Sequence, residues 1–305
     1  MTKQKTMPTP FSFFGSSRFS VIVLEQLFRK GLIPSYIITT VDKPIGRKQI
    51  ITANVVKQWA NEKNIPVYDP AKLNQEFVDQ LIKLNKNTDG SEKCPVFLVA
   101  SYGKIIPKVI IDLPSRKTLN IHPSLLPKYR GPSPLPSAML DDDKKTGVTI
   151  MRIDEEMDHG PIVAKKEVVV TEWPIYEKYE AMMADEGAKL FAEILPKWIA
   201  GEIKEQEQDH SIATYTKKIT KEDGLIDLSG DAYTNFRKIQ AYHEWPKAYF
   251  FMKHTARSTG SGQDKEIRVK ITEASFSDGQ LKIQKVIPEG AKEMAYEDFL
   301  RGYKN

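Results

Sequence analysis

The stretch TLNIHPSLLPKYRGPSPLPS, residues 118–137, decides the fold class. It begins with the apolar pattern of a β-strand and then breaks into prolines and a glycine, which predicts a strand that ends in a loop. Asn120 and His122 lie two residues apart, so both side chains lie on the same face of that strand. Open α/β sheets bind ligands beyond the carboxyl ends of their strands. From the pair alone, a core histidine bonded to a neighbouring amide is an equally good interpretation.

Apolar runs of strand length surround this stretch and alternate with helical patterns. The runs are FSFF at 11–14, YIITT at 36–40, VFLVA at 96–100 and VTIMRI at 148–153. Helical spacing of apolar residues occurs at 21–28, 55–59 and 77–84, and from Tyr176 to Ile199, where Gly201 follows as a cap. The alternation predicts an α/β fold with a Rossmann-like, mostly parallel sheet covered by helices.

The chain changes character after Gly201. The next segment, EIKEQEQDHS at 202–211, is polar and predicts a linker. A helical pattern and short alternating segments follow it, at 232–242, 248–252, 267–271 and 281–286. We therefore predict a larger domain over 1–204 and a smaller β-rich domain over 205–305. The Ser/Gly/Thr cluster at 255–263 predicts a mobile loop.

Composition narrows the class of protein. The chain has 305 residues, 40% of them apolar, which is enough for two domains. Its single cysteine, Cys94, excludes an intramolecular disulfide, and no Cys/His spacing indicates zinc. The start of the chain is polar and no run of 18 apolar residues occurs, so we expect a cytoplasmic protein without a membrane span. No heptad pattern is present, so we expect a monomer.

Positive charge gathers in two zones of the chain. The net charge is +5, and residues 1–48 and 237–270 each hold eight Lys or Arg against two and three acidic residues. Such zones can follow a phosphate backbone by Coulomb attraction. Composition alone favours the simpler interpretation, a solvated charged surface.

An acidic loop supplies the partner that His122 needs. The stretch GVTIMRIDEEMDHGPIVAKK, 147–166, predicts a strand, a tight acidic loop and a second strand. A carboxylate in that loop could face His122, fix its tautomer and share the movement of a proton with it. Acidic turn residues considered by themselves are usually solvated.

The residue types fit acyl transfer to an amine, which needs a stabiliser for the charged oxygen and an acceptor for the amine proton. Asn, His and Asp provide both. A covalent intermediate is not predicted, because Ser124 lies in no G-x-S-x-G elbow and Cys94 follows charged loop residues. The five histidines show no metal-ligand spacing, and Gly15-Ser16-Ser17 lacks the nucleotide-binding glycine patterns, so we predict neither a metal nor a nucleotide site.

The joint pattern resembles the folate-dependent formyltransferase family. That family's signature is Asn-x-His, a Ser-Leu-Leu-Pro loop, and a Gly-Val-Thr strand that leads to an Asp. Here the signature residues are Asn120, His122, Ser124-Leu125-Leu126-Pro127, Gly147-Val148-Thr149 and Asp158. The likeness covers nearly the whole chain and is closest to the branch that acts on initiator tRNA. It includes VDKPIGRK at 41–48, ASYGKIIPK at 100–108, YRGPSPL at 129–135 and LKIQKVIPEGAKEMAYEDFLRG at 281–302.

The resemblance implies roles for particular residues. Asn120 and His122 would polarise the formyl carbonyl, while Asp158 orients His122 and assists proton movement. The formyl donor, 10-formyltetrahydrofolate, would be held by Ser124, Leu125, Leu126, Pro127, Tyr102, Gly103, Ile105, Ile106 and Asp154. The acceptor would be the α-amino group of methionyl initiator tRNA, gripped by Arg47, Lys48 and Arg130. No metal is implied.

Two other functions stay open at this point: formylation of an amino-sugar nucleotide by a sister enzyme with the same three residues, and RNA binding without catalysis. The loop DKPIGRK and the ending PEGAKEMAYEDFL favour tRNA. The chain departs from the pattern in having a less basic loop at 46–57 and Pro136 in place of glutamine. It also lacks a β segment between Ala274 and Leu281, so the OB-like barrel implied for the smaller domain is expected to be shortened.

Overall fold

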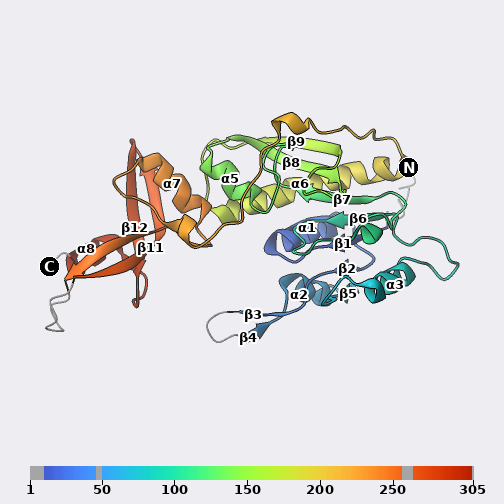
Figure 1. Ribbon diagram of the computed structural model, residues 1–305, viewed down its shortest axis with the longest axis horizontal. Helices are drawn as coiled ribbons and strands as arrows, with labels where there is room; N and C mark the ends of the chain where they lie inside the picture. The colour runs from blue at the N-terminus through green and yellow to red at the C-terminus, as the bar shows by residue number, and fades with distance from the viewer. Residues whose placement is uncertain (1–9, 46–49, 256–263, 304–305) are drawn as a thin grey trace, which may run out of the picture. The chain divides into compact units, whose positions relative to one another are not determined.

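The computed structural model describes residues 10–45, 50–255 and 264–303, and its main element is a seven-stranded sheet in the order β5-β2-β1-β6-β7-β8-β9 (Figure 1). The strands are β1 Phe11–Phe14, β2 Ile37–Ile38, β5 Val67–Tyr68, β6 Val96–Val99, β7 Thr118–His122, β8 Lys145–Arg152 and β9 Ile162–Val169. Strands β5, β2, β1, β6 and β7 pair in parallel, and β7 pairs antiparallel with β8. The predicted mostly parallel α/β sheet is confirmed.

Helices follow the strands in chain order, and the four helical patterns predicted over this part of the chain are confirmed. They are α1 Arg18–Arg29, α2 Val55–Glu62, α3 Gln75–Leu84 and α6 Tyr176–Ala200, and the short α4 Lys108–Ile111 is an additional helix that was not predicted. Ser17, Asn54 and Asn74 cap the first three of them by accepting a backbone amide. Gly201 follows α6 with φ +76°, the left-handed conformation that glycine adopts without strain. A small hairpin, β3 Lys43–Ile45 and β4 Ile50–Thr52, precedes α2.

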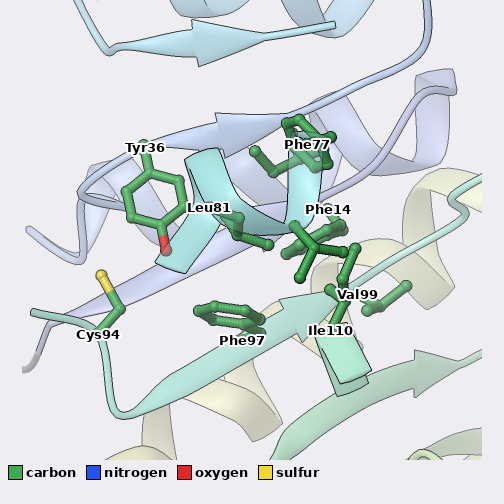
Figure 2. Close-up of a cluster of buried hydrophobic side chains, with 10 residues drawn as sticks. Phe14, Tyr36, Phe77, Leu81, Cys94, Phe97, Val99 and Ile110 are labelled. Carbon is green, nitrogen blue, oxygen red and sulfur yellow. The ribbon is translucent and has the colours of Figure 1, made fainter. Parts of the chain in front are cut away.

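The two faces of the sheet bury different helices, because successive side chains of a strand point to opposite faces. Phe11 of β1 meets Phe191 of α6 edge to face, with the ring centres 5.5 Å apart. Phe14 of the same strand belongs instead to a buried cluster with Phe77 and Leu81 of α3 (Figure 2). Strands buried on both faces are almost continuously apolar in sequence, as VFLV is and as FSFF is apart from the buried Ser12.

The chain forms two compact units that interleave in sequence. The first comprises residues 1–131, 146–168 and 180–215, and the second comprises 132–145, 169–179 and 216–305. The second unit contains α5 Pro134–Leu140, α7 Ala232–Ala241, β10 Tyr249–Thr255, β11 Asp264–Ser277, β12 Gln280–Pro288, β13 Met294–Ala295 and α8 Tyr296–Tyr303. The division at residue 205 stays a prediction. Residues 256–263 of the predicted mobile loop lie outside the described residues.

The sheet of the second unit is antiparallel, in the order β10-β11-β12-β13. Ser277 pairs with Gln280, which leaves Asp278 and Gly279 as a two-residue turn, both at positive φ (+52° and +73°) as such hairpins require. Between Ala274 and Leu281, where the sequence predicted a missing β segment, β11 and β12 are joined directly by this hairpin turn. The β-rich character is confirmed, while the OB-like barrel stays a prediction. No helix in the described part of the chain is long and apolar enough to cross a membrane.

Candidate active site

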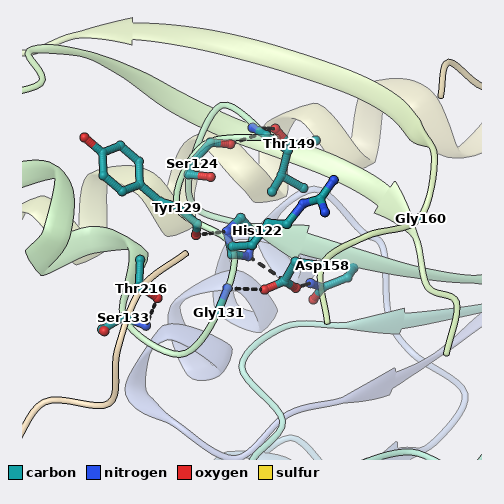
Figure 3. A network of polar contacts seen from close by, with 12 residues as sticks. His122, Ser124, Tyr129, Gly131, Ser133, Thr149, Asp158, Gly160 and Thr216 are labelled. Carbon is teal, nitrogen blue, oxygen red and sulfur yellow. Dashed lines mark hydrogen bonds and ion pairs between the residues drawn. The ribbon is translucent and has the colours of Figure 1, made fainter. Parts of the chain in front are cut away.

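Asn120 and His122 both lie on strand β7. The acidic loop after β8 brings Asp158 to His122 (Figure 3). The Oδ1 atom of Asp158 lies 3.6 Å from Nδ1 of His122 and 3.5 Å from Nδ2 of Asn120. The His122 side chain is 5% exposed and the Asp158 side chain 15%. The three residues predicted to be catalytic thus form one cluster that is shielded from most of the solvent.

The tautomer of His122 follows from its second contact. Its Nε2 lies 2.9 Å from the main-chain oxygen of Tyr129. A carbonyl oxygen can only accept a hydrogen bond, so we assign the proton to Nε2. Nδ1 is then the nitrogen that faces Asp158. Tyr129 has φ +60°, a left-handed conformation uncommon for a residue with a side chain.

The carboxylate of Asp158 is oriented by the loop that follows β7. Its Oδ2 accepts a hydrogen bond from the main-chain amide of Gly131 at 2.7 Å, so its Oδ1 is the oxygen that faces Asn120 and His122. Asp158 itself has φ +51°. A carboxylate held this way can orient an imidazole and share a proton with it, while the Asn120 amide can donate to an oxygen that gains negative charge.

The Ser-Leu-Leu-Pro loop is held from within. Ser124 is fully buried, and its hydroxyl donates to the Lys128 carbonyl at 2.6 Å. Thr149 donates to the Ser124 carbonyl at 2.7 Å and accepts the Leu126 amide at 3.1 Å. Leu126 is also fully buried. The side chains of Ser124 and Leu126 therefore stabilise the loop, and Leu125 and Pro127 are its more accessible members.

The loop after β6 contains the other predicted donor contacts. The Tyr102 hydroxyl is buried and has no hydrogen-bond partner among the described residues, and burial raises the pKa of this phenol to about 12. The Gly103 amide donates to the Ser16 hydroxyl at 3.2 Å. Ile105 is 95% exposed, whereas Ile106 packs against the core cluster. An unsatisfied buried hydroxyl and an exposed apolar side chain in one loop fit a ligand with polar and apolar parts.

A hollow of about 240 Å³ lies beside the acidic loop. It is lined by Lys108, Ile111, Asp112, Arg152, Ile153, Asp154, Glu155, Glu156 and His159. Asp154 accepts a hydrogen bond from Nδ1 of His159 at 2.7 Å and from the Glu156 amide at 3.0 Å, so its carboxylate is engaged within the loop. Within the described residues no group of three or more His, Cys, Asp or Glu side chains could hold a metal ion.

Arg130, predicted to contact tRNA, is 1% exposed. Its guanidinium donates to Gln208 at 2.7 Å and 3.1 Å, to Nδ1 of His210 at 2.8 Å and to the Tyr215 hydroxyl at 3.2 Å. A buried guanidinium that is already engaged by three side-chain acceptors is poorly placed to reach a phosphate. The sequence indicated neither this burial nor its partners, because an arginine between Tyr129 and a glycine in a proline-rich loop has the pattern of an exposed residue.

The other predicted tRNA contacts, Arg47 and Lys48, lie outside the described residues. The base of their hairpin is well held, since Asp42 accepts the Asn54 amide at 3.0 Å and pairs with Lys57 at 3.2 Å. The Asn54 amide and then Lys57 lower the pKa of the Asp42 carboxyl. The hairpin therefore projects from a fixed point next to α2.

Known proteins resemble the chain in sequence over nearly its whole length. A formyl transferase model matches residues 13–195, and a model of the formyl transferase C-terminal domain matches residues 218–304. A methionyl-tRNA formyltransferase from Sulfurihydrogenibium sp. (strain YO3AOP1) is 36% identical, and the match covers 96% of each chain. The chain therefore belongs to the formyl transferase family, in the branch of the methionyl-tRNA formyltransferases.

Solved structures share the fold. A methionyl-tRNA formyltransferase from Clostridium thermocellum has a TM-score of 0.58 and 15% identity, covering 92% of this chain and 98% of its own. A sugar N-formyltransferase from Shewanella sp. has the same TM-score and identity, covering 85% and 96%. Equal likeness to both means that the fold does not separate tRNA from sugar acceptors. The sequence relatives make that separation.

Proposed function

We propose that this chain transfers the formyl group of 10-formyltetrahydrofolate to the α-amino group of methionine on initiator tRNA. The main observation that supports this proposal is that Asn120, His122 and Asp158 form a cluster at the carboxyl end of strand β7, in a chain that belongs to this family. Relatives with nearly full coverage bear the name methionyl-tRNA formyltransferase, which supports the acceptor. The reaction supplies the formylated tRNA for translation initiation.

The proposed chemistry needs only these side chains. Asn120 donates to the formyl oxygen as the amine attacks, and His122 can donate to the same oxygen from Nδ1 once that nitrogen has taken up a proton. Asp158 keeps the His122 ring in register and shares the proton that the amine loses. A bond forms between the amine nitrogen and the formyl carbon, the bond to the donor nitrogen breaks, and the amine's proton ends on that leaving nitrogen.

We propose that the donor lies between the loop after β6 and the acidic loop. The Tyr102 hydroxyl, buried without a partner among the described residues, fits a polar group of the folate, and Gly103, Ile105 and Ile106 continue that side. Asp154 lines the neighbouring hollow. From the Ser-Leu-Leu-Pro loop we retain Leu125 and Pro127 as contacts, and assign Ser124 and Leu126 to holding the loop.

For the tRNA we retain Arg47 and Lys48 as the proposed contacts, because they belong to a basic stretch of sequence between β3 and β4, and the residue before β3, Asp42, is fixed by the Asn54 amide. Arg130 is better explained as an internal support, since its guanidinium is buried among hydrogen-bond acceptors. We further propose that the protein works as a monomer in the cytoplasm. Its mass in solution, measured by light scattering, checks the first of these statements.

The test is transfer of labelled formyl from 10-formyltetrahydrofolate to methionylated initiator tRNA, beside an amino-sugar nucleotide. We expect labelling of the tRNA and a loss of at least about 100-fold in the His122→Ala variant. Labelling of the sugar without the tRNA would keep the chemistry and overturn the acceptor. Absence of transfer to either amine would overturn the proposed function.

A further inference from the structure

The polar segment after α6 lies across the two loops that orient the candidate catalytic groups. Gln206 pairs with Ile162 through two main-chain hydrogen bonds of 2.7 and 2.9 Å. Further along, the Thr214 carbonyl accepts the Arg130 amide at 2.9 Å, and its hydroxyl accepts the Tyr129 amide at 2.8 Å. Residues 206–211, which belong to the predicted linker, and the four residues that follow them are therefore bonded at both ends to the first unit. We call residues 206–215 the strap.

Gln208 lies in the middle of the strap, is 4% exposed, and uses both ends of its amide. Its Nε2 donates to the main-chain oxygens of Asp158 at 2.9 Å and Gly160 at 2.7 Å. Its Oε1 accepts two hydrogen bonds from Arg130. Carbonyl oxygens only accept and a guanidinium only donates, so this network permits one orientation of the amide.

These contacts close a ring around Asp158. Gln208 holds its main-chain oxygen, Arg130 holds Gln208, and Gly131, next to Arg130, donates to the Asp158 carboxylate. The main chain of Asp158 is left-handed, at φ +51°, a conformation that residues with side chains keep only when their surroundings hold it. Gln208 donates one hydrogen bond to the main-chain oxygen of Asp158 and a second to that of Gly160, two residues further along the chain.

We propose that Gln208 is a positioning residue for formyl transfer: it holds the Asp158 main chain so that the carboxylate keeps facing Asn120 and His122. It acts through Asp158 and touches no reacting atom. This inference rests on the proposed function. It adds the strap to the catalytic apparatus, with Arg130 as the group that locks the glutamine amide.

The first experiment compares Gln208→Ala with Gln206→Ala, a matched change at an exposed glutamine two residues away. Misplacement of a catalytic group by about 1 Å lowers the rate on the order of 100-fold. We therefore expect Gln208→Ala to lower kcat by about 30-fold and to change the KM for the formyl donor and the KM for the tRNA by less than about threefold each. Gln206→Ala should keep wild-type kcat. An unchanged kcat in Gln208→Ala, or a loss confined to KM, overturns the proposal.

A second comparison separates positioning from general damage to the fold. In an Asp158→Ala background, Gln208→Ala should cause no further loss of kcat, because the group it positions is gone. If Gln208→Ala lowers kcat by the same factor in the wild type and in the Asp158→Ala background, Gln208 has a structural role that does not act through Asp158. Gln208→Glu keeps an acceptor for Arg130 but turns a carboxylate toward two carbonyls, so it should lose as much kcat as Gln208→Ala.

Hydrogen exchange at the Gly131 amide keeps this test independent of activity. That amide donates to the Asp158 carboxylate, so Gln208→Ala should speed its exchange by about tenfold or more, and Gln206→Ala should not. A wild-type chain that transfers no formyl would overturn the proposed function, while the exchange rate would still test whether Gln208 positions Asp158. Unchanged exchange in Gln208→Ala overturns that positioning role even in an active enzyme.

Discussion

Two aspartates of the acidic loop each pair with a histidine, and the two pairs differ in a way that distance alone would misjudge. Asp154 and His159 are 2.7 Å apart, and both side chains are 29% exposed. Asp158 and His122 are 3.6 Å apart, and their side chains are 15% and 5% exposed. The shorter pair is the more solvated one, and the longer pair is the one that the sequence pattern assigns to catalysis.

The difference lies in what else each partner binds. In the longer pair, Gly131 donates to the Asp158 carboxylate and the Tyr129 carbonyl accepts from the His122 ring, so each group has a main-chain partner besides the other group. In the shorter pair, the His159 ring instead stacks on His210, with ring centres 4.0 Å apart. Groups that are held by the main chain as well as by each other can present their remaining atoms to a substrate in a fixed geometry.

The largest effect should come from breaking the longer pair. Asp158→Ala removes the carboxylate that orients His122, and we expect kcat to fall about 1,000-fold, within the range of acid–base contributions. Single-turnover transfer to methionylated tRNA measures it. The melting temperature of the variant serves as the control for folding. A loss below about tenfold in a folded variant would remove Asp158 from the catalytic set.

A smaller effect should follow from shortening the 3.6 Å distance between the Asp158 carboxylate and Nδ1 of His122. Asp158→Glu adds one methylene, which pushes the carboxylate toward His122 and away from the Gly131 amide, and we expect kcat to fall about 100-fold. The same single-turnover assay applies. If this variant matches the wild type, the 3.6 Å separation has no catalytic importance.

The shorter pair should matter for stability more than for rate. Asp154→Ala and His159→Ala should each keep kcat within about threefold, and a double-mutant cycle of unfolding free energies should give a coupling of about 0.5–1 kcal/mol, as for other partly solvated pairs. Denaturant titration of the four proteins provides the cycle. A rate loss equal to that of Asp158→Ala would show that the two pairs had been assigned the wrong way round.

The smallest effect should come from Tyr102, which lies outside both pairs. Tyr102→Phe removes a hydroxyl buried without a partner among the described residues, so it should stabilise the ligand-free protein by about 1 kcal/mol and weaken donor binding without changing kcat. Burial raises the pKa of this phenol from 10.0 to about 12. The wild type should therefore lose stability as pH rises from 10 to 12, and Tyr102→Phe should lose less. Equal alkaline loss in both proteins would contradict this account.

The pairing of Asn120 with His122 was predictable because its signal is local, whereas the choice of Asp158 within the acidic loop came from the resemblance to the family. A two-residue spacing puts Asn120 and His122 on one face of a strand, and a second strand followed by an acidic loop brings a carboxylate near them. The long helix ending at Gly201 was equally visible, since apolar periodicity and a left-handed cap are properties of neighbouring residues. Their roles in catalysis stay predictions that the variants above examine.

The supports of the cluster could not be predicted, for two physical reasons. The Tyr129 carbonyl and the Gly131 amide are backbone groups, which every residue type supplies and no pattern distinguishes. Gln208 acts over a separation of 50 residues from Asp158, within a polar run that has the composition of a linker. The two-residue strands β2 and β5 are likewise too short for period-two alternation to mark their bounds.

The strap also determines where this chain can be cut. The family model for the larger part matches up to residue 195, and the sequence places the domain boundary near 205. A catalytic fragment that ends at either position loses Gln208, although it keeps Asn120, His122 and Asp158. Such a fragment would have low activity because Gln208 no longer holds the loop of Asp158. The loss of activity could then be misinterpreted as evidence that the smaller domain is needed for tRNA binding. A fragment that extends through Tyr215 separates these two causes.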